Sequence, residues 1–245
     1  MKRVKNFFKC VLLLITFLTG CDKDHLGDCL KSTGSIVSET RPVSDFSRID
    51  VYNNVEVIIT QDTVNSITVE AGKHIMYGIT TEINDGILTI RNENKCNWVR
   101  SYSKTIVVYV HEKDLNMIHH HGSATVSSAN TLVGTTFDFN VWNSGDMRLS
   151  VSAGNIYSRQ HSTVGDMTLS GNSTFVYIYN AGNAFTYEKD LIAQNSDIDQ
   201  RGTGDIYVQA SQSLAVSIHD SGNVYYSGNP QVTSSVTGSG KLIHQ

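Results

Sequence analysis

The stretch Asn143-Ser144-Gly145-Asp146-Met147-Arg148-Leu149 decides the fold, because its glycine, polar residue and apolar residue recur along the C-terminal half of the chain. The glycines of these copies are Gly122, Gly145, Gly165, Gly182, Gly204, Gly222 and Gly240. Their spacing varies around a mean of about 20 residues, a period that is typical of one coil in a stacked solenoid.

Apolar residues stand at fixed even offsets from each glycine. Those two places after it are Ala124, Met147, Met167, Ala184, Ile206, Val224 and Leu242, and those four places before it include Ile118, Val141, Ile178 and Ile218. Such alternation predicts a half-buried strand on each side of a glycine turn. His161 and Gln200 also stand four places before a glycine, and we interpret both as local register shifts.

One strand–turn–strand unit cannot bury its apolar face alone, so the copies must stack on one another. The repeat therefore predicts an all-β fold with a single β-solenoid, similar to a right-handed β-helix or β-roll, with coils of about 20 residues. The alternative is a β-sandwich of regularly spaced hairpins. A recurrent glycine turn favours the solenoid, since a sandwich has no reason to repeat one turn at every second strand.

Composition agrees with a β fold and limits the classes of function. The 245 residues include only two prolines and carry a net charge of -4. Removal of Lys2, Arg3, Lys5 and Lys9 with an N-terminal signal would lower this charge to -8. An acidic chain lacks the basic stripe that nucleic-acid binding requires, so we expect no nucleic-acid partner.

Residues 1–20 have a basic start and an apolar run too short for a membrane span, as in a secretory signal. The following Leu18-Thr19-Gly20-Cys21 resembles the lipobox of bacterial lipoproteins, which implies that Cys21 carries a lipid anchor. The alternative is an ordinary signal peptide followed by a free cysteine. We expect residues 21–40 to form a tether from the membrane.

Acidic residues directly after Cys21 resemble the export signals that place lipoproteins of the Bacteroidetes type on the outer face of the outer membrane. A solvated linker on the periplasmic face is the alternative. Cys29 and Cys96 remain as a pair, and an oxidising compartment predicts a disulfide between them. A zinc site would need clustered histidines beside these two cysteines.

The folded domain is expected over residues 41–245, with N-terminal strands over 41–118 and glycine-turn coils over 119–245. Alternation with period two predicts strands at 46–51, 55–60, 66–71, 86–90, 105–110 and 115–118. Asn84-Asp85-Gly86 predicts a tight hairpin turn before the fourth of them.

The runs Phe46–Val51, Val55–Gln61, Val69–Ala71 and Asp85–Ile90, followed by the glycine repeats, resemble the family named "putative auto-transporter adhesin, head GIN domain". The resemblance covers about residues 43 to 245. It implies a β-solenoid whose activity is uncharacterised, and it carries over no catalytic residues.

Catalytic and metal-binding patterns are weak. A polysaccharide lyase or hydrolase needs a base beside a carboxylate or calcium cluster, and we expect no enzyme here. Asp146, Asp166 and Asp205 occupy turn positions where structural hydrogen bonding explains them. In a strand only His119 and His121 of the histidine triplet share a face, and two ligands make a weak metal site. We therefore predict neither a metal nor a cofactor.

One outward column is the candidate binding strip. The residues three places before each glycine are His119, Trp142, Ser162, Tyr179, Arg201, His219 and Thr237, and stacking spaces them about 4.8 Å apart. Aromatic and arginine side chains are frequent energetic anchors of interfaces. The alternative is that Trp142 and Tyr179 only pack against neighbouring strands.

The sequence therefore favours a monomeric envelope lipoprotein that presents a rigid solenoid surface for binding or adhesion, with a glycan or a surface protein as its partner. A structural role in an envelope complex is the alternative, and a polysaccharide-active β-helix enzyme is the third hypothesis.

Cys21→Ala tests the lipid anchor directly. Acylation needs the cysteine thiol, so cells grown with a labelled fatty acid should label the wild-type protein and leave the variant unlabelled. The measurement is the label recovered in the immunoprecipitated chain. Equal labelling of both chains would contradict the anchor.

Overall fold

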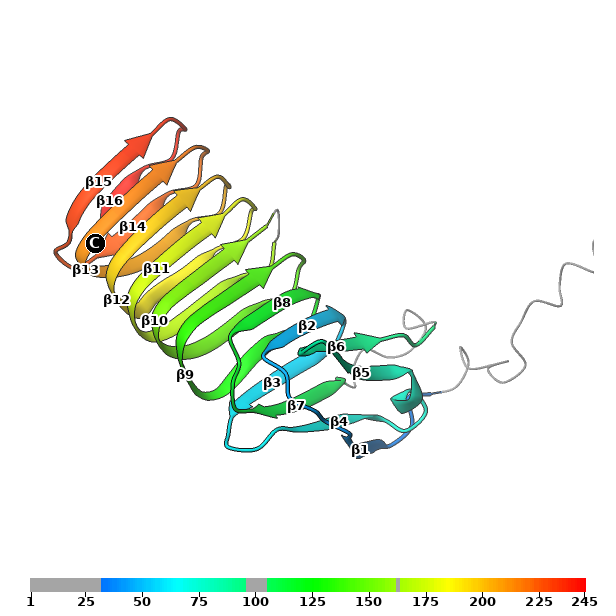
Figure 1. Ribbon diagram of the computed structural model, residues 1–245. Coiled ribbons are helices and arrows are strands. Elements are labelled where there is room, and N and C mark those ends of the chain that lie inside the picture. The colour runs from blue at the N-terminus through cyan, green and yellow to red at the C-terminus, as the bar shows by residue number, and fades with distance from the viewer. Residues whose placement is uncertain (1–31, 96–104, 162–163) are drawn as a thin grey trace, which may run out of the picture.

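The computed structural model describes residues 32–95, 105–161 and 164–245, and nearly all of its regular structure is β (Figure 1). The first elements in the chain are β1 (Ile36–Arg41), β2 (Arg48–Asn53), β3 (Glu56–Gln61), β4 (Ser66–Gly72), the 3-10 turn η4 (Met76–Gly78), β5 (Ile79–Asn84), β6 (Ile87–Asn92), β7 (Val107–Glu112) and β8 (Met117–Gly122). The later elements are β9 (Val126–Val141), β10 (Met147–Gln160), β11 (Met167–Asn180), β12 (Thr186–Gln200), β13 (Ile206–Ile218), β14 (Val224–Ser227), β15 (Gln231–Val236) and β16 (Leu242–His244).

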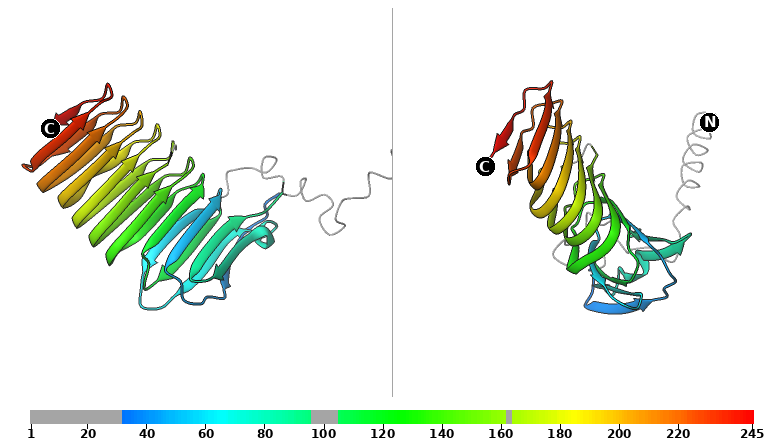
Figure 2. Two further views of the ribbon diagram at one scale, coloured as in Figure 1. Left: turned by 45° about the horizontal axis from the view of Figure 1, so that its top comes forward. Right: turned by 60° about the vertical axis from the view of Figure 1, so that its left-hand side comes forward.

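Successive long strands pair in parallel, which confirms the solenoid and excludes the sandwich of hairpins. Strands β9 to β13 stack in order, and each one bends so that its two halves lie in opposite layers of the coil. Figure 2 shows the coils stacked along one axis. The result is a β-solenoid of about six turns with coils of about 20 residues.

Two layers enclose the core. Layer 1 contains β1, β4, β7, β3, the first halves of β9 to β13, β14 and β16, and layer 2 contains β5, β6, β2, β8, the second halves of β9 to β13, and β15. The N-terminal strands therefore extend both layers of the solenoid, and they join it through β3 and β8 (Figure 1).

The N-terminal strands match the predicted segments closely, and β1 and β5 are two strands that were not predicted. The hairpin between β5 and β6 pairs Asn84 with Ile87, and its turn residues Asp85 and Gly86 have φ values of 51° and 74°. This confirms the predicted Asp-Gly turn, which needs positive φ at both central positions.

Strand β1 pairs antiparallel with β4, so the described sheet begins at Ile36, inside the segment expected to be a tether. The polar composition of β1 concealed it, because its side chains are exposed or half-buried.

The described ranges contain no helix that is both long and apolar enough to span a membrane.

The coils have more even lengths when they are measured between paired residues than when they are measured between the glycines. The paired inward positions are Val126, Met147, Met167, Thr186, Ile206, Val224 and Leu242. The expectation that Ala124 and Ala184 share this column is wrong. They lie two residues earlier, beside the glycines of the adjacent coils, and a Cβ on Gly204 would collide with the carbonyl oxygen of Ala184. The repeated glycines belong to two columns because the turns differ in length.

A buried polar side chain closes four of the turns. These residues are His120, Gln160, Asn180 and Gln200, and each has zero exposure. In the best example, Gln200 Nε2 donates to the Gly204 carbonyl at 2.6 Å, and the Gly202 N–H donates to Gln200 Oε1 at 3.0 Å. The register shift proposed for Gln200 is therefore wrong, because this residue points inward in normal register. The register shift predicted at His161 is confirmed, because Gln160 occupies the inward position and His161 is the next residue along the chain.

The core between the layers is mostly aliphatic, and it includes the acid Glu188. Glu188 has zero exposure, and neither of its carboxyl oxygens has a hydrogen-bond partner among the described residues. The hydroxyls of Ser158 and Ser196 are buried without a partner as well. Burial raises the pKa of Glu188 to about 7, because the apolar interior disfavours the carboxylate.

Replacing Gln200 by leucine should lower the free energy of unfolding by about 2 kcal/mol, because a buried N–H and a buried carbonyl in the turn lose their partners. Urea denaturation measures the change. Gln231→Leu is the matched control, since Gln231 is exposed on β15 and its replacement should have little effect. Equal stability of the two variants would contradict the role assigned to Gln200.

Glu188 should make the protein less stable as pH rises. Between pH 4.5 and about 7 the folded state keeps the Glu188 proton that the unfolded state has released, so the free energy of unfolding falls, by up to about 3 kcal/mol. Glu188→Gln removes this loss, and urea midpoints at pH 5 and pH 8 measure it. Glu82→Gln, on the exposed side of β5, should keep the wild-type slope. Identical slopes for wild type and Glu188→Gln would refute the assignment.

Candidate binding face

The outer surface of layer 2 gathers aromatic, histidine and charged side chains into three parallel columns, which we call the aromatic face. Its first column contains Arg48, Met117, Asp138, Tyr157 and Tyr177, its second contains Asp50, His119, Asn140, Arg159 and Tyr179, and its third contains Tyr52, His121, Trp142 and His161. These positions alternate with core residues along each strand, so the strands that form the coils also fix the face.

Rings of the third column stack on one another along the solenoid axis. Tyr52 and His121 have ring centroids 4.8 Å apart, His121 and Trp142 are 5.9 Å apart, and Trp142 and His161 are 3.7 Å apart, with interplanar angles of 10°, 15° and 5°. Arg91 covers Tyr52 at 4.0 Å. His161 therefore covers one ring face of Trp142 closely, His121 lies over the other with a larger offset, and 45% of Trp142 remains exposed.

The row ends in a tilted ring. Tyr179 lies 5.5 Å from His161 at an angle of 47°, so its face is not covered in the parallel manner of the other rings. Tyr157 and Tyr177 are likewise tilted, by 55°, at a centroid distance of 6.4 Å. The Arg159 guanidinium lies over the rings of Tyr157 and Tyr177, at 4.8 and 5.8 Å from their centres, so the tilted Tyr179 is the ring best placed for flat contact with a ligand ring.

The carboxylates of the face are paired with arginines. Arg48 donates to both oxygens of Asp50 at 2.6 and 2.8 Å, and the same guanidinium lies 2.9 Å from His119 Nδ1. Asp138 forms an ion pair with Arg159, whose guanidinium lies 4.8 Å from the centre of the Tyr157 ring. These contacts hold the long arginine side chains in place.

A polar chain links the first column to the third. Asn140 Nδ2 donates to Asp138 Oδ1 at 2.7 Å, and Asn140 Oδ1 lies 2.9 Å from His161 Nε2. Because the asparagine oxygen can only accept, the imidazole must carry its proton on Nε2. His161 is thus held by a hydrogen bond and by the stack with Trp142, so the row is rigid before any ligand arrives.

The histidines of the face are neutral at physiological pH. Burial lowers the pKa of His119, of His121 and of His161, and the nearby arginines lower it further. Arg48 acts on His119 and Arg159 acts on His161. The row therefore presents uncharged ring edges, which donate and accept hydrogen bonds.

The predicted strip lies on two columns of one surface. His119 and Tyr179 belong to the second column, whereas Trp142 is in the third, whose continuation over the later coils contains Arg201, His219 and Thr237. The single column is wrong because counting from the glycines ignores the different lengths of the turns. Ser162 lies outside the described residues, as do Cys21, Cys29 and Cys96.

His121 and His161 belong to the ring row but were not in the predicted strip. Counting positions from the strands, instead of from the glycines, would have identified them. The histidine triplet itself places His121 beside Trp142, and the predicted separation of His119 and His121 from the inward His120 is confirmed. His119 and His121 stand edge to face at 6.0 Å, and the Arg48 contact takes His119 Nδ1.

The turn aspartates have the structural role expected of them. Asp146 accepts from the Asp166 N–H at 3.1 Å, Asp166 accepts from the Phe185 N–H at 2.8 Å, and Asp205 accepts from the Asn223 N–H at 2.8 Å. Each carboxylate thus satisfies the backbone of the next coil.

A second ring row lies on the outer surface of layer 1. Tyr187, Tyr207 and Tyr225 stack at 5.4 and 4.8 Å, and Phe185 extends them at 5.9 Å. Here parallel stacking continues through all four rings. This row provides matched control residues for the aromatic face.

Comparison with known proteins places the fold. The family model described as "Putative auto-transporter adhesin, head GIN domain" matches residues 45–230. A putative adhesin from Bacteroides fragilis is 19% identical with a TM-score of 0.81, covering 88% of this chain and 100% of that chain.

Two structures from Parabacteroides species are also similar. A putative lipid binding protein from Parabacteroides distasonis is 17% identical with a TM-score of 0.68, covering 88% of this chain and 100% of that one. A putative adhesin from Parabacteroides merdae is 16% identical with a TM-score of 0.66, covering 86% and 97% of the two chains. Comparison with curated proteins gave no match.

Proposed function

This chain belongs to the family described as "Putative auto-transporter adhesin, head GIN domain", and from that membership we propose that its aromatic face is an adhesive surface on a cell-envelope lipoprotein. The observation that carries the proposal is the rigid row of stacked rings around the exposed Trp142. A surface ordered before binding loses little side-chain entropy when a ligand arrives.

The stacking geometry also specifies how the face binds. Sugar rings cannot lie flat on Trp142, because His121 and His161 cover its faces. The ring edges instead offer N–H groups and imidazole nitrogens at the spacing of the coils, and the tilted Tyr179 offers a ring face at one end. A chain-like ligand that runs along the solenoid axis would match this arrangement.

The proposal includes the expected location on the outer membrane, with the anchor at Cys21. The described chain begins beside β1 and β4, and the coils extend away from these strands (Figure 2). An anchor on the N-terminal side would therefore leave the aromatic face clear of the membrane. We propose a monomer, since one chain contains the whole face.

A binding role is favoured over catalysis by the pairing of the acids. On this face Asp50 and Asp138 each form an ion pair with an arginine of the face, so their carboxylates have a structural role. The aspartates of the turns are engaged by backbone N–H groups.

Trp142→Ala combined with Tyr179→Ala should reduce binding of the purified protein to glycan arrays or host-matrix preparations by at least about tenfold, because interface energy concentrates in such anchors. The variant loses three ring contacts, each worth about 0.5 to 1.5 kcal/mol, so the melting temperature should fall by several degrees while the protein stays folded.

Tyr225→Ala is the control, because it removes a stacked ring from the opposite layer and should leave binding unchanged. Protease on intact cells should remove both the solenoid and the binding. Survival of the solenoid would favour a scaffold inside the envelope, and equal loss of binding in the control would exclude the aromatic face.

A further inference from the structure

A groove of about 620 Å³ runs beside the first column of the aromatic face, where the N-terminal strands meet the first coil. Its lining comes from the end of β3, the turn before β8, the bend of β9 and the second half of β10. Its lining includes Gln61, Asp114, Asn116, Val133, Thr136 and Tyr157. The volume is in the range of about 300 to 1,000 Å³ that is usual for small-molecule sites.

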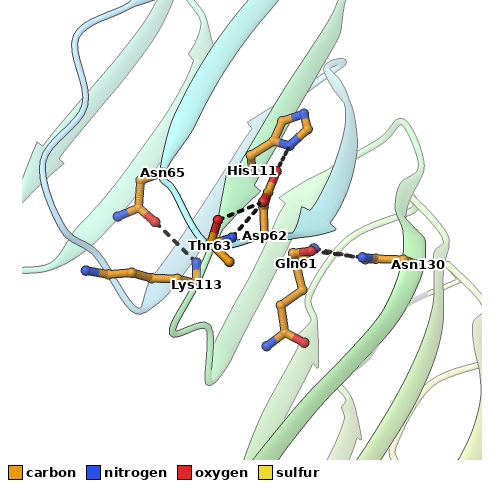
Figure 3. A network of polar contacts seen from close by, with 7 residues as sticks. All are labelled: Gln61, Asp62, Thr63, Asn65, His111, Lys113 and Asn130. Atoms are coloured by element: carbon orange, nitrogen blue, oxygen red, sulfur yellow. Dashed lines mark hydrogen bonds and ion pairs between the residues drawn. The ribbon is translucent and has the colours of Figure 1, made fainter.

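Paired hydrogen bonds fix one wall of this groove. The Gln61 side chain donates to the Val133 carbonyl at 2.9 Å and accepts from the Val133 N–H at 2.7 Å. Asn130 bonds the backbone of Gln61 in the same reciprocal way, with both distances 2.9 Å. Figure 3 shows this contact between the end of β3 and β9. The bend of β9 is therefore held to β3.

The neighbouring rim is tied down as well. His111 Nδ1 lies 3.1 Å from Asp62 Oδ2, and the Lys113 N–H donates to Asn65 Oδ1 at 3.2 Å (Figure 3). The buried Glu112 accepts from the N–H groups of Asp114 and Leu115 at 2.8 and 2.6 Å, which fixes the turn before β8. The groove is formed before any ligand binds.

The charges around the groove nearly cancel, with one carboxylate more than the basic groups. Lys113 Nζ lies 3.2 Å from Asp45 and 3.9 Å from Asp114, and Asp138 is paired with Arg159. An anionic ligand would meet two carboxylates, and a cationic ligand would compete with paired bases. An uncharged ligand fits this balance best.

The lining combines apolar and hydrogen-bonding groups in the way that a sugar requires. Tyr157, Met117 and the 59% exposed Val133 supply apolar surface. The exposed Asp114, Asn116 and Thr136 supply a carboxylate, an amide and a hydroxyl at the rim. A lipid tail would need a continuous apolar wall, which these polar groups interrupt.

Tyr157 is placed to contact a sugar ring. In its column the neighbours are Asp138 on one side and Tyr177 on the other, and of these two Asp138 lines the groove with it. The side of Tyr157 that faces Asp138 therefore borders the groove, away from the tilted Tyr177. The Arg159 guanidinium lies over the ring at 4.8 Å and holds it in place, so a ligand contacts the part of the ring that Arg159 leaves open.

From these contacts we propose that the groove binds a ring of a neutral polysaccharide, whose chain continues along the aromatic face. The groove and the ring row lie on one face, because Asp138 lines the groove and is linked through Asn140 to His161, which stacks on Trp142. This inference rests on the proposed function and names its ligand class. Sugar hydroxyls bond to the rim, and the apolar face of the sugar ring packs on Tyr157.

The test uses the purified full-length protein in detergent and isothermal titration with cellohexaose, maltohexaose, mannohexaose and chitohexaose, with polygalacturonate as the anionic probe. At least one neutral hexasaccharide should bind with a Kd of about 1 mM or tighter. Tyr157→Ala should weaken that binding by at least about tenfold, and Tyr157→Phe should retain it within about threefold. Tyr225→Ala is the control and should bind like wild type.

Asp114→Ala combined with Asn116→Ala is a second variant that changes only exposed rim groups, and it should also lose binding with an unchanged melting temperature. Failure of every neutral probe to bind, preference for polygalacturonate, or wild-type affinity in both groove variants would overturn the inference. If cell or matrix adhesion depends on Trp142 while the groove variants adhere normally, the proposed function stands and the groove assignment falls.

Discussion

Backbone hydrogen bonding between successive coils is the constraint on which the rest of this structure depends. Each coil presents a row of N–H and carbonyl groups that only the next coil can satisfy, so the coils must stack in parallel and nearly in register. Register then fixes every side chain into a column. Differences in turn length are absorbed at the corners, where buried residues such as Gln200 and Asn180 satisfy the turn backbone.

The same stacking shapes the outer surface. Strands lie about 4.8 Å apart, which is close enough for planar side chains in one column to contact each other face to face. Trp142 between two histidines is the clearest case, and the tyrosine row from Tyr187 to Tyr225 repeats it on layer 1. A solenoid therefore converts repeated aromatic residues into rigid rows whose edges are outermost. Recognition by ring faces is left to the tilted Tyr157 and Tyr179.

The junction between the N-terminal strands and the coils offers chemistry that the regular repeat lacks. Within the coils, opposite charges pair across neighbouring strands, as at Asp138 and Arg159. At the junction, the bend of β9 departs from the β3 pairing and is held by Gln61 and Asn130. This departure leaves a groove bordered by Tyr157. Irregularity at the start of the repeat thus creates a concave site beside a flat face.

The sequence by itself determined the solenoid, the length of its coils, the Asp85-Gly86 turn and the inward direction of His120, because these follow from local alternation and turn chemistry. It also placed Trp142 on the outer surface. Only the tertiary structure decided which residues share a column, since that depends on turn lengths and strand pairing. It therefore separated His119 from Trp142, joined His161 to the row, and brought Gln61 beside Val133, which lies far from it along the chain. Contacts between distant segments produce no repeating pattern in the sequence, so the groove could be found only in the tertiary structure.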